Sequence, residues 1–167
     1  MLEIIKYPNQ ILRQRTKKVV DILAPEIQEL ISAMIATMKN AEGVGLAAPQ
    51  VNKNLRILAV NLNNAPQVFV NPKIIWKSFF KKKVFEEGCL SFPGIFGLVK
   101  RYQWIKLKYF NPKGQLCKIK AAGLLATVLQ HEINHLSGIL FIDKVLKYTK
   151  GEDKVKELIK QANYKER

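Results

Sequence analysis

The chain has 167 residues, of which 48% are apolar and 25% charged, a composition typical of one globular domain and not of a disordered protein. Its longest nearly unbroken apolar stretch, residues 121–129, is far shorter than the roughly 20 residues of a membrane-spanning helix, and no secretory signal pattern opens the chain. The two cysteines, Cys89 and Cys117, exclude a disulfide-rich scaffold and are expected to stay reduced.

The formal net charge is +15, and it comes from 23 lysines and only 5 arginines. Proteins that read bases or hold phosphates bidentately favour arginine, so sequence-specific binding of nucleic acid is not indicated. The spread of lysines along the chain fits a solvated cationic surface produced by a bias toward lysine. The alternative is a weak, transient attraction of the basic surface and C-terminal tail to a large polyanion such as the ribosome.

The first half of the chain predicts an arm, a helix and strands. Residues 1–20 mix Pro8, a short apolar pair and many charges, and predict an extended arm. Apolar side chains recur every three or four residues over 25–41, which predicts an amphipathic helix. Strands are expected over 55–61 and 68–76, with Pro72 indicating an edge or a bulge in the second.

The second half predicts a hairpin, a second helix and a tail. Apolar residues alternate with lysines on both sides of a turn over 104–120, which predicts an antiparallel hairpin with one solvated face. A helix is expected over 122–136, and a short buried strand over 139–142. The basic tail, about 144–167, has a thin apolar stripe typical of a surface helix. We therefore expect a single α+β domain, residues 1–167, with mostly antiparallel sheets around a central helix.

The segment His131-Glu132-x-x-His135 lies within the second predicted helix. Histidines four residues apart share a helix face, so both imidazoles can bind one metal ion. Glu132 can take a proton from water beside that metal, without being a ligand, and return it to a leaving group. Accidental spacing is the weaker alternative, because the chain has no other histidine. A closed structural site, with four protein ligands, is the stronger one.

Several residues are candidates for a further metal ligand. Glu152 and Asp153 stand roughly where His-Glu-x-x-His peptidases have an acidic ligand, but they lie in the charged tail. Cys89 is the better candidate, because Gly88 lets the backbone approach closely and because a thiolate with two imidazoles leaves one position open for water. Cys117 is the other thiol, and its place in the hairpin predicts a packing role.

A segment rich in glycine and alanine, residues 43–50 with the sequence GVGLAAPQ, follows the first predicted helix. Its small residues let the chain run close to another group, although a tight turn from helix to strand would use the same residues. The glycines lack the rest of a dinucleotide-binding fingerprint, and no strand precedes them. Gln50 at the end of the segment is a neutral donor that suits a developing oxyanion.

Taken together, residues 43–50, 87–91 and 131–135 resemble three motifs of peptide deformylase: Gly-x-Gly-x-Ala-Ala-x-Gln, Glu-Gly-Cys-x-Ser and His-Glu-x-x-His, in this order. The resemblance extends from about residue 4 to residue 143. It implies a metal-dependent hydrolase that removes the formyl group from N-terminal formyl-methionine of nascent polypeptides. Because the chain begins close to the first family-like residues, we expect no transit peptide, a bacterial cytoplasmic location and no membrane partner.

The resemblance also implies the metal and its ligands. One divalent ion per chain is expected, Fe²⁺ in the cell, with Zn²⁺ or Ni²⁺ able to replace it. Cys89, His131 and His135 would be the ligands, and Glu132 would be the general base and acid. The chemistry of the residues agrees, because metal polarisation and an activated water, with two oxyanion donors, suffice to hydrolyse a small formamide.

The remaining implied roles concern the substrate. Gln50 and the backbone N–H of Leu90 would donate to the formyl oxygen as the tetrahedral intermediate forms, and Gly45 would align the substrate backbone like an added strand. The methionine side chain is expected in an apolar pocket beside the motifs, although core packing is an equal alternative for its members. The residues expected to contact substrate, besides Gly45, are Gly43, Val44, Phe85, Leu124 and Val128, with Phe96 as a further wall.

One position departs from the family pattern, because Asn134 stands where the family has Asp. Its expected partner is Arg101, from which Asn can still accept a hydrogen bond although it carries no charge. We expect a modest effect on stability or tuning and no loss of activity. Two alternatives stay open: a diverged deformylase-like protein of low activity with a ribosome-binding role, and a metallopeptidase. The complete set of motif residues argues against the first, and the cysteine ligand against the second.

Overall fold

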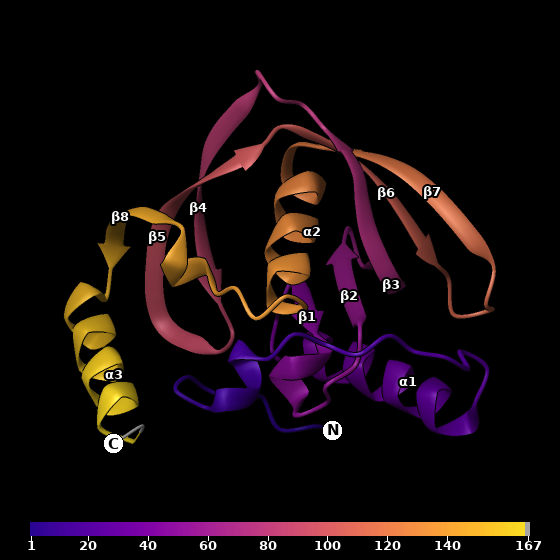
Figure 1. Cartoon of the computed structure of the whole chain (residues 1–167), viewed down its shortest axis with the longest axis horizontal. Helices are drawn as coiled ribbons and strands as arrows, with labels where there is room; N and C mark the ends of the chain where they lie inside the picture. Colours follow the sequence, from indigo (N-terminus) through magenta and orange to yellow (C-terminus); the bar gives the residue numbers. More distant parts are fainter. Residues whose placement is uncertain (166–167) are drawn as a thin grey trace.

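The structure, a computed structural model, describes residues 1–165, with side chains as far as Ala162 (Figure 1). Three short 3₁₀ helices are η1 (Gln10–Arg13), η2 (Ala48–Val51) and η3 (Phe141–Asp143). The α-helices are α1 (Pro25–Asn40), α2 (Gly123–His135) and α3 (Glu152–Lys165). The strands are β1 (Gly45–Ala47), β2 (Ile57–Leu62), β3 (Ala65–Lys77), β4 (Lys82–Cys89), β5 (Phe92–Tyr102), β6 (Trp104–Phe110), β7 (Leu116–Ala122) and β8 (Val145–Lys150).

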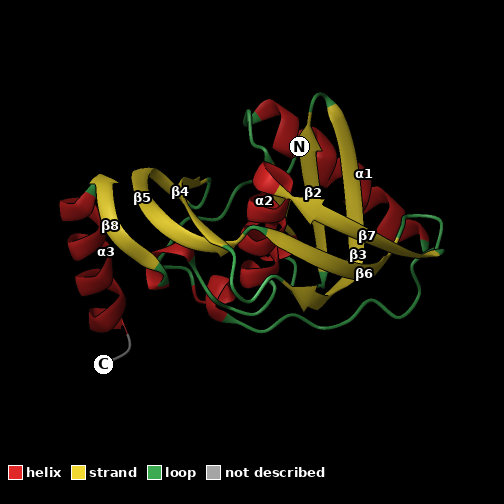
Figure 2. Ribbon diagram, turned by 90° about the horizontal axis from the view of Figure 1, so that it is seen from above, coloured by secondary structure: helices red, strands yellow, loops and turns green. Residues whose placement is uncertain are grey.

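The strands form two sheets. One has five strands in the order β1-β2-β3-β6-β7, and the other has three in the order β4-β5-β8. Every pairing within them is antiparallel. Helix α2 stands between the two sheets, and α3 lies at the far end of the smaller one (Figures 1 and 2). The expected α+β fold, with antiparallel sheets around the central helix, is confirmed.

Three apolar clusters hold these elements together. Helix α1 packs its buried stripe against the sheet through β1, β2 and β3. One face of α2, with Leu129 and Ile133, packs on the inner face of β6 and β7, with Ile105 and Leu107. The third cluster joins β5 to η1, η3 and α3, with Phe92 at its centre. Because α2 is packed against the large sheet, its other face is left for the cavity between the sheets.

Most elements predicted from periodicity are confirmed. Helices α1 and α2, strand β2 and the β6–β7 hairpin begin and end within two or three residues of the expected positions. Pro72 lies at a bulge in β3, where the register with β6 shifts between Val70 and Lys73. This bulge allows a proline inside an interior strand, because its missing N–H falls where the ladder is interrupted. No helix in residues 1–165 has the length and apolar character needed to cross a membrane.

Other local predictions were wrong or incomplete. Residues 139–142 do not form a strand; the side chain of Asp143 accepts a hydrogen bond from the N–H of Leu140 at 2.8 Å, which closes the short η3 turn. The tail does not begin as a helix, because β8 precedes α3 and pairs with β5. Strands β1, β4 and β5 were not anticipated, and the N-terminal arm contains η1. Cys117 is half-buried in β7 and not fully buried.

Candidate metal centre and substrate groove

One thiol and two imidazoles meet between the sheets. One ligand atom from each of Cys89, His131 and His135 lies within 4.8 Å of the other two, and Cys89 Sγ is 3.2 Å from His135 Nε2. The register of α2 places both histidines one turn apart on the face turned toward the smaller sheet. Cys89 ends β4 at a register shift next to Gly88, where any side chain would collide with the ring of Phe96. The thiol favoured in the sequence therefore completes the cluster.

The donor set fits a divalent metal ion. Nδ1 of His131 is 2.9 Å from a Glu87 oxygen, which leaves Nε2 of His131 as its ligand atom. Glu132 Oε2 is buried without a hydrogen-bond partner among the described residues, as expected of a group whose partner belongs to a reaction. Two imidazoles and a thiolate are a common ligand set for a catalytic metal with an open coordination position.

A chain of hydrogen bonds supports the first histidine. Arg101 on β5 donates from Nε and Nη2 to the two oxygens of Glu87, at 2.6 and 2.7 Å, and from Nη1 to Asn134 Oδ1 at 2.6 Å. Burial opposes the charged form of Glu87, but the hydrogen bonds from Arg101 and His131 outweigh it and lower the pKa of Glu87 to about 2. The predicted bond between Arg101 and Asn134 is present.

Sequence reasoning assigned no role to Glu87. The signal was available, because Glu86 and Glu87 are the only acidic residues between positions 43 and 131. A carboxylate two residues before a candidate metal ligand, in so basic a segment, indicates a specific partner. In the structure that carboxylate fixes the tautomer of His131 and joins α2 to the β4–β5 hairpin.

Glu132 lies on α2 with only 4% of its surface exposed. Burial raises its pKa to about 7; the charge of Glu87 adds to this effect, while His131 and Arg101 oppose it. A carboxyl group that titrates near neutral pH can both accept and return a proton. Gly45 on β1 runs directly beside it, and a side chain there would collide with the Glu132 carboxylate. The glycine thus allows β1 to form the wall next to Glu132.

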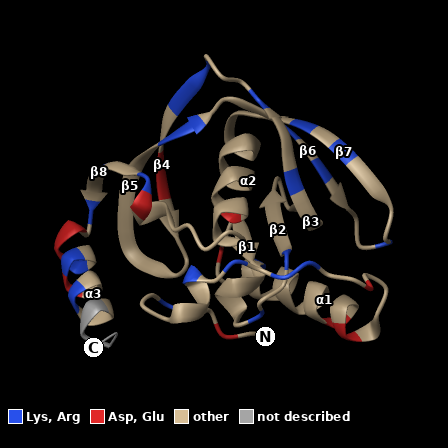
Figure 3. Ribbon diagram, viewed as in Figure 1, with Lys and Arg blue, Asp and Glu red and all other residues tan. Residues whose placement is uncertain are grey.

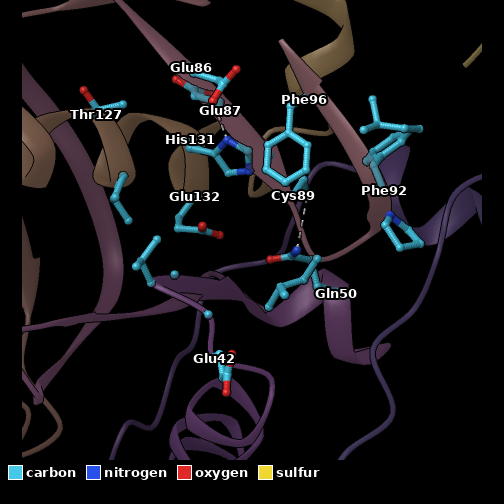
Figure 4. Close-up of a pocket in the computed structure, with 18 of the residues that line it drawn as sticks. Glu42, Gln50, Glu86, Glu87, Cys89, Phe92, Phe96, Thr127, His131 and Glu132 are labelled. Atoms are coloured by element: carbon cyan, nitrogen blue, oxygen red, sulfur yellow. Dashed lines mark hydrogen bonds and ion pairs between the residues drawn. The ribbon is translucent and has the colours of Figure 1, made fainter. Parts of the chain in front are cut away.

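Gln50 on η2 lies beside Cys89 of the thiol–imidazole cluster. Its Oε1 accepts a hydrogen bond from the N–H of Ala47 at 2.8 Å, which orients the amide. Its Nε2 is 3.3 Å from Ser91 Oγ and 3.5 Å from Cys89 Sγ. The ends of the Gln50 and Glu132 side chains point toward one another across the space beside Cys89 (Figure 4). A fixed N–H donor and a carboxyl group therefore face the same small volume.

Comparison with known proteins decides the family. The model of the family described as polypeptide deformylase matches residues 1–151. The chain belongs to the peptide deformylase family. A peptide deformylase of Mesorhizobium japonicum is 44% identical over 86% of this chain and 84% of its own length. The activity is accordingly that of a peptide deformylase, a metal-dependent amidohydrolase that removes the N-formyl group from nascent peptides.

Solved structures agree with this assignment. The crystal structure of the Thermotoga maritima peptide deformylase superposes with a TM-score of 0.84 at 39% identity, covering 87% of this chain and 97% of that one. A peptide deformylase from Acinetobacter baumannii, solved with Met-Ala-Ser bound, gives a TM-score of 0.82 at 33% identity, covering 87% of this chain and 98% of that one. The deformylase fold therefore extends over most of the chain.

The cavity of the deformylase has a volume of about 480 Å³ and lies between α2, β1 and the β4–β5 hairpin (Figure 4). Val44 and Leu124 at its rim are about half exposed, while Val128 deeper in is buried. Phe85 is not part of the lining, which on β4 begins only at Glu86, whereas Phe96 on β5 does line the cavity. The predicted residues found in the lining are Gly43, Val44, Gly45, Gln50, Cys89, Leu90, Phe96, Leu124, Val128, His131 and Glu132.

The lining also contains residues that sequence reasoning did not identify. Glu42 and Glu86 stand at its rim, and Lys6 reaches it from the N-terminal arm, where its Nζ is 2.6 Å from the carbonyl oxygen of Leu90. Phe92 and Thr127 line it further. None of these residues belongs to a recognisable motif, and only the pairing of β4 with β5 and the docking of the arm bring them together.

Proposed function

We propose that Cys89, His131 and His135 hold the metal of this deformylase, with Fe²⁺ the ion used in the cell and Zn²⁺ or Ni²⁺ able to replace it. The close approach of the three donor atoms is the observation that carries the proposal. When bound, such an ion polarises a carbonyl oxygen and makes nearby water more acidic. A thiolate with two imidazoles suits Fe²⁺, Zn²⁺ and Ni²⁺ and disfavours the hard ions Ca²⁺ and Mg²⁺.

Glu132 moves the proton in this proposal. It takes a proton from water as the water oxygen adds to the formyl carbon, and it gives the proton to the amine nitrogen as the C–N bond breaks. Formate and a free N-terminus are the products. Gln50 Nε2 and the backbone N–H of Leu90 donate to the oxygen that gains negative charge in between. The raised pKa of Glu132 and the fixed amide of Gln50 support these roles.

The substrate is proposed to be the formyl-methionine end of a nascent chain. Strand β1 is at the edge of its sheet, so the backbone at Gly43, Val44 and Gly45 is placed to pair with an extended peptide. The methionine side chain would then enter the apolar part of the cavity, between Val128 and Phe96, with Leu124 at its mouth. Phe85 is left out of this pocket because it does not line the cavity.

We further propose that residues 1–167 form one catalytic domain that acts in the bacterial cytoplasm and associates transiently with ribosomes. The basic C-terminal element supports the association. Its exposed lysines include Lys144, just before β8, Lys147 on β8, and Lys154 and Lys160 on α3. Helix α3 lies at one end of the molecule (Figure 3). Exposed lysines of this kind raise the rate of encounter with polyanions but do not recognise a particular nucleotide sequence.

The test is formate release from formyl-Met-Ala-Ser by protein prepared anaerobically with Fe²⁺, with Glu132→Ala as the paired control. We expect turnover in the parent and a loss of about 10²–10⁴-fold in the variant, with one metal retained per chain in both. A metal-free Glu132→Ala protein would contradict the acid–base role. No turnover by a metal-loaded parent would favour a diverged, ribosome-binding protein, and cleavage of unformylated Met-Ala-Ser would favour a metallopeptidase.

A further inference from the structure

The outer face of the five-stranded sheet carries an array of lysines. Alternation along β6 and β7 turns the apolar residues toward α2 and the lysines toward solvent. Strand β3 adds one more lysine to the same surface (Figure 3). Two partly exposed tryptophans, Trp76 and Trp104, lie among these lysines. We call this surface the lysine face. Its members are Lys73, Trp76, Trp104, Lys106, Lys108, Lys118 and Lys120.

The strand register sets these lysines directly opposite one another. Lys108 is paired with Lys73 on one side and with Lys118 on the other, and Lys106 is paired with Lys120. Cβ atoms of directly opposite residues are about 4.5–5.5 Å apart, so like charges there repel. Strands β3, β6 and β7 contain no acidic residue, and within the described part of the chain none of these lysines forms an ion pair. The face therefore concentrates positive charge that the protein does not neutralise.

Two ordinary explanations do not account for this arrangement. Lysines on an edge strand prevent pairing with other chains, and this explains Lys118 and Lys120 on β7. It does not explain Lys73 on β3 or Lys106 and Lys108 on β6, because both strands are interior. A bias toward lysine explains their number but not their pairing, since surfaces free of function mix both signs of charge.

The tryptophans add a second observation. Nζ of Lys106 is 5.5 Å from the centre of the Trp76 ring, and Nζ of Lys120 is 4.4 Å from that of Trp104. Trp76 is 44% exposed and Trp104 is 36% exposed. The rings hold ammonium groups above the sheet and leave part of their own surface open. Proteins that bind single-stranded nucleic acids combine lysines, which contact the phosphates, with exposed aromatic rings, on which the bases stack.

We propose that the lysine face binds RNA through its phosphate backbone, without reading sequence. Lysines two apart on one strand are about 7 Å apart and neighbouring strands about 4.8 Å, so the face offers a grid of point charges to regularly spaced phosphates. An anionic membrane would require apolar side chains that project beyond the charges, whereas here the rings lie under the ammonium groups. The other face of the same strands packs on α2, so bound RNA leaves the groove open.

Binding of the full chain to a fluorescein-labelled 20-nucleotide oligo(U) RNA, followed by fluorescence anisotropy at several KCl concentrations, tests this proposal. The face variant combines Lys106→Gln, Lys108→Gln, Lys118→Gln and Lys120→Gln. The matched control combines Lys17→Gln, Lys18→Gln, Lys39→Gln and Lys53→Gln, which removes the same charge from exposed positions outside both the lysine face and the basic C-terminal element. We expect the face variant to lose about tenfold or more in affinity at low salt, and its salt slope to fall by about 3, because each phosphate contact adds about 0.7.

The other outcomes overturn the proposal. Equal weakening in both variants would mean that net charge alone attracts RNA. Binding of the parent to phosphatidylserine vesicles but not to RNA would mean that the lysine face is a membrane-binding surface.

Thermal unfolding gives a readout that is independent of RNA. Removal of the opposed charges should raise the Tm of the face variant, and a lower Tm would contradict the proposed repulsion between the lysines. Formate release should be unchanged in the face variant, and since RNA binding is measured without peptide, failure of the deformylase assay would leave this result standing.

Discussion

The two walls of the active-site groove are built in different ways. On one wall, helix α2 supplies His131, Glu132 and His135, whose spacing follows from helical periodicity alone. On the other, the β4–β5 hairpin supplies Cys89, whose position depends on how the two strands pair and on the register shift between Gly88 and Cys89. The wall that depends on pairing is joined to the helix by Glu87 and Arg101. A metal centre shared between the walls therefore needs that connection as well as its ligands.

The largest expected effect comes from removing the ligand of the hairpin wall. Cys89→Ala leaves two imidazoles on α2, and the protein should no longer retain metal or release measurable formate. Metal analysis after gel filtration and the formate assay check this, with Cys117→Ala as the control that removes a thiol outside the centre. Full metal content in Cys89→Ala would show that the helix wall holds the ion without the hairpin.

Gln50 belongs to neither wall. Its replacement is expected to lower the rate of the reaction without changing the metal content. Gln50→Ala should lower kcat/KM for formyl-Met-Ala-Ser by about 10²–10³-fold, because one oxyanion donor is lost, while metal content stays at one per chain. Steady-state kinetics and metal analysis on the same preparation measure both. A variant that loses metal in proportion to activity would instead mean that Gln50 acts by holding Cys89, to whose sulfur it is 3.5 Å away.

Breaking the connection between the walls should have an intermediate effect. Glu87→Gln weakens the support of His131 and leaves Arg101 buried without a carboxylate, so metal affinity should fall about 10–100-fold and stability by about 3 kcal/mol or more. Competition with a chelator and urea unfolding measure the two. Glu86→Gln, at an exposed neighbouring position, is the matched control and should leave both unchanged.

The same pair predicts a dependence on pH. The pKa of Glu87 in the folded protein is lowered to about 2 from an ordinary 4.5. Its contribution to stability is therefore present above about pH 4.5 and is lost as the pH falls toward 2. The difference in unfolding free energy between metal-free parent and Glu87→Gln should shrink over that range. A difference that stays constant in acid would show that the variant destabilises by packing and not by charge.

The smallest expected effect concerns Asn134, where the helix meets the same Arg101. Asn134→Asp replaces the neutral acceptor of the Arg101 hydrogen bond with a charged one and should stabilise the protein by about 1 kcal/mol, with activity nearly unchanged. For a chain of this size that corresponds to a rise in Tm of about 2–4 °C, measurable by calorimetry. A lower Tm would mean that the buried cluster does not accommodate a second carboxylate.

The contrast between the walls also explains what the sequence could predict. The metal ligands on α2 and the β6–β7 hairpin were predictable because their patterns are local: a helical turn in one case, alternation about a tight turn in the other. Strands β4 and β5 were not, because two lysines open β4 and the glycines at 88, 94 and 97 interrupt alternation. The pairing of Glu87 with Arg101, and the absence of Phe85 from the cavity, depend on that register.

Short apolar runs were the other source of error. Residues 139–142 contribute Leu140 and Phe141 to the third apolar cluster. A turn buries these two side chains as well as a strand would. Nothing in four apolar residues distinguishes a strand from a turn. The turn is closed by a local cap, in which Asp143 accepts from the N–H of Leu140, and Asp143 is held in turn by Arg13, 130 residues earlier in the chain. The contact with Arg13 has no signature in the local sequence.

The free edge of β1 has a consequence for when the enzyme can act. An open strand edge in water is a template for aggregation, but β1 has three residues and lies beside a cavity of about 480 Å³, where a folded neighbour has no room. The backbone groups of that edge can be reached only by a narrow, extended segment whose own backbone is unpaired. An N-terminus that is already packed into its own folded protein therefore cannot pair with β1. Deformylation must take place after the N-terminus is synthesised and before it folds.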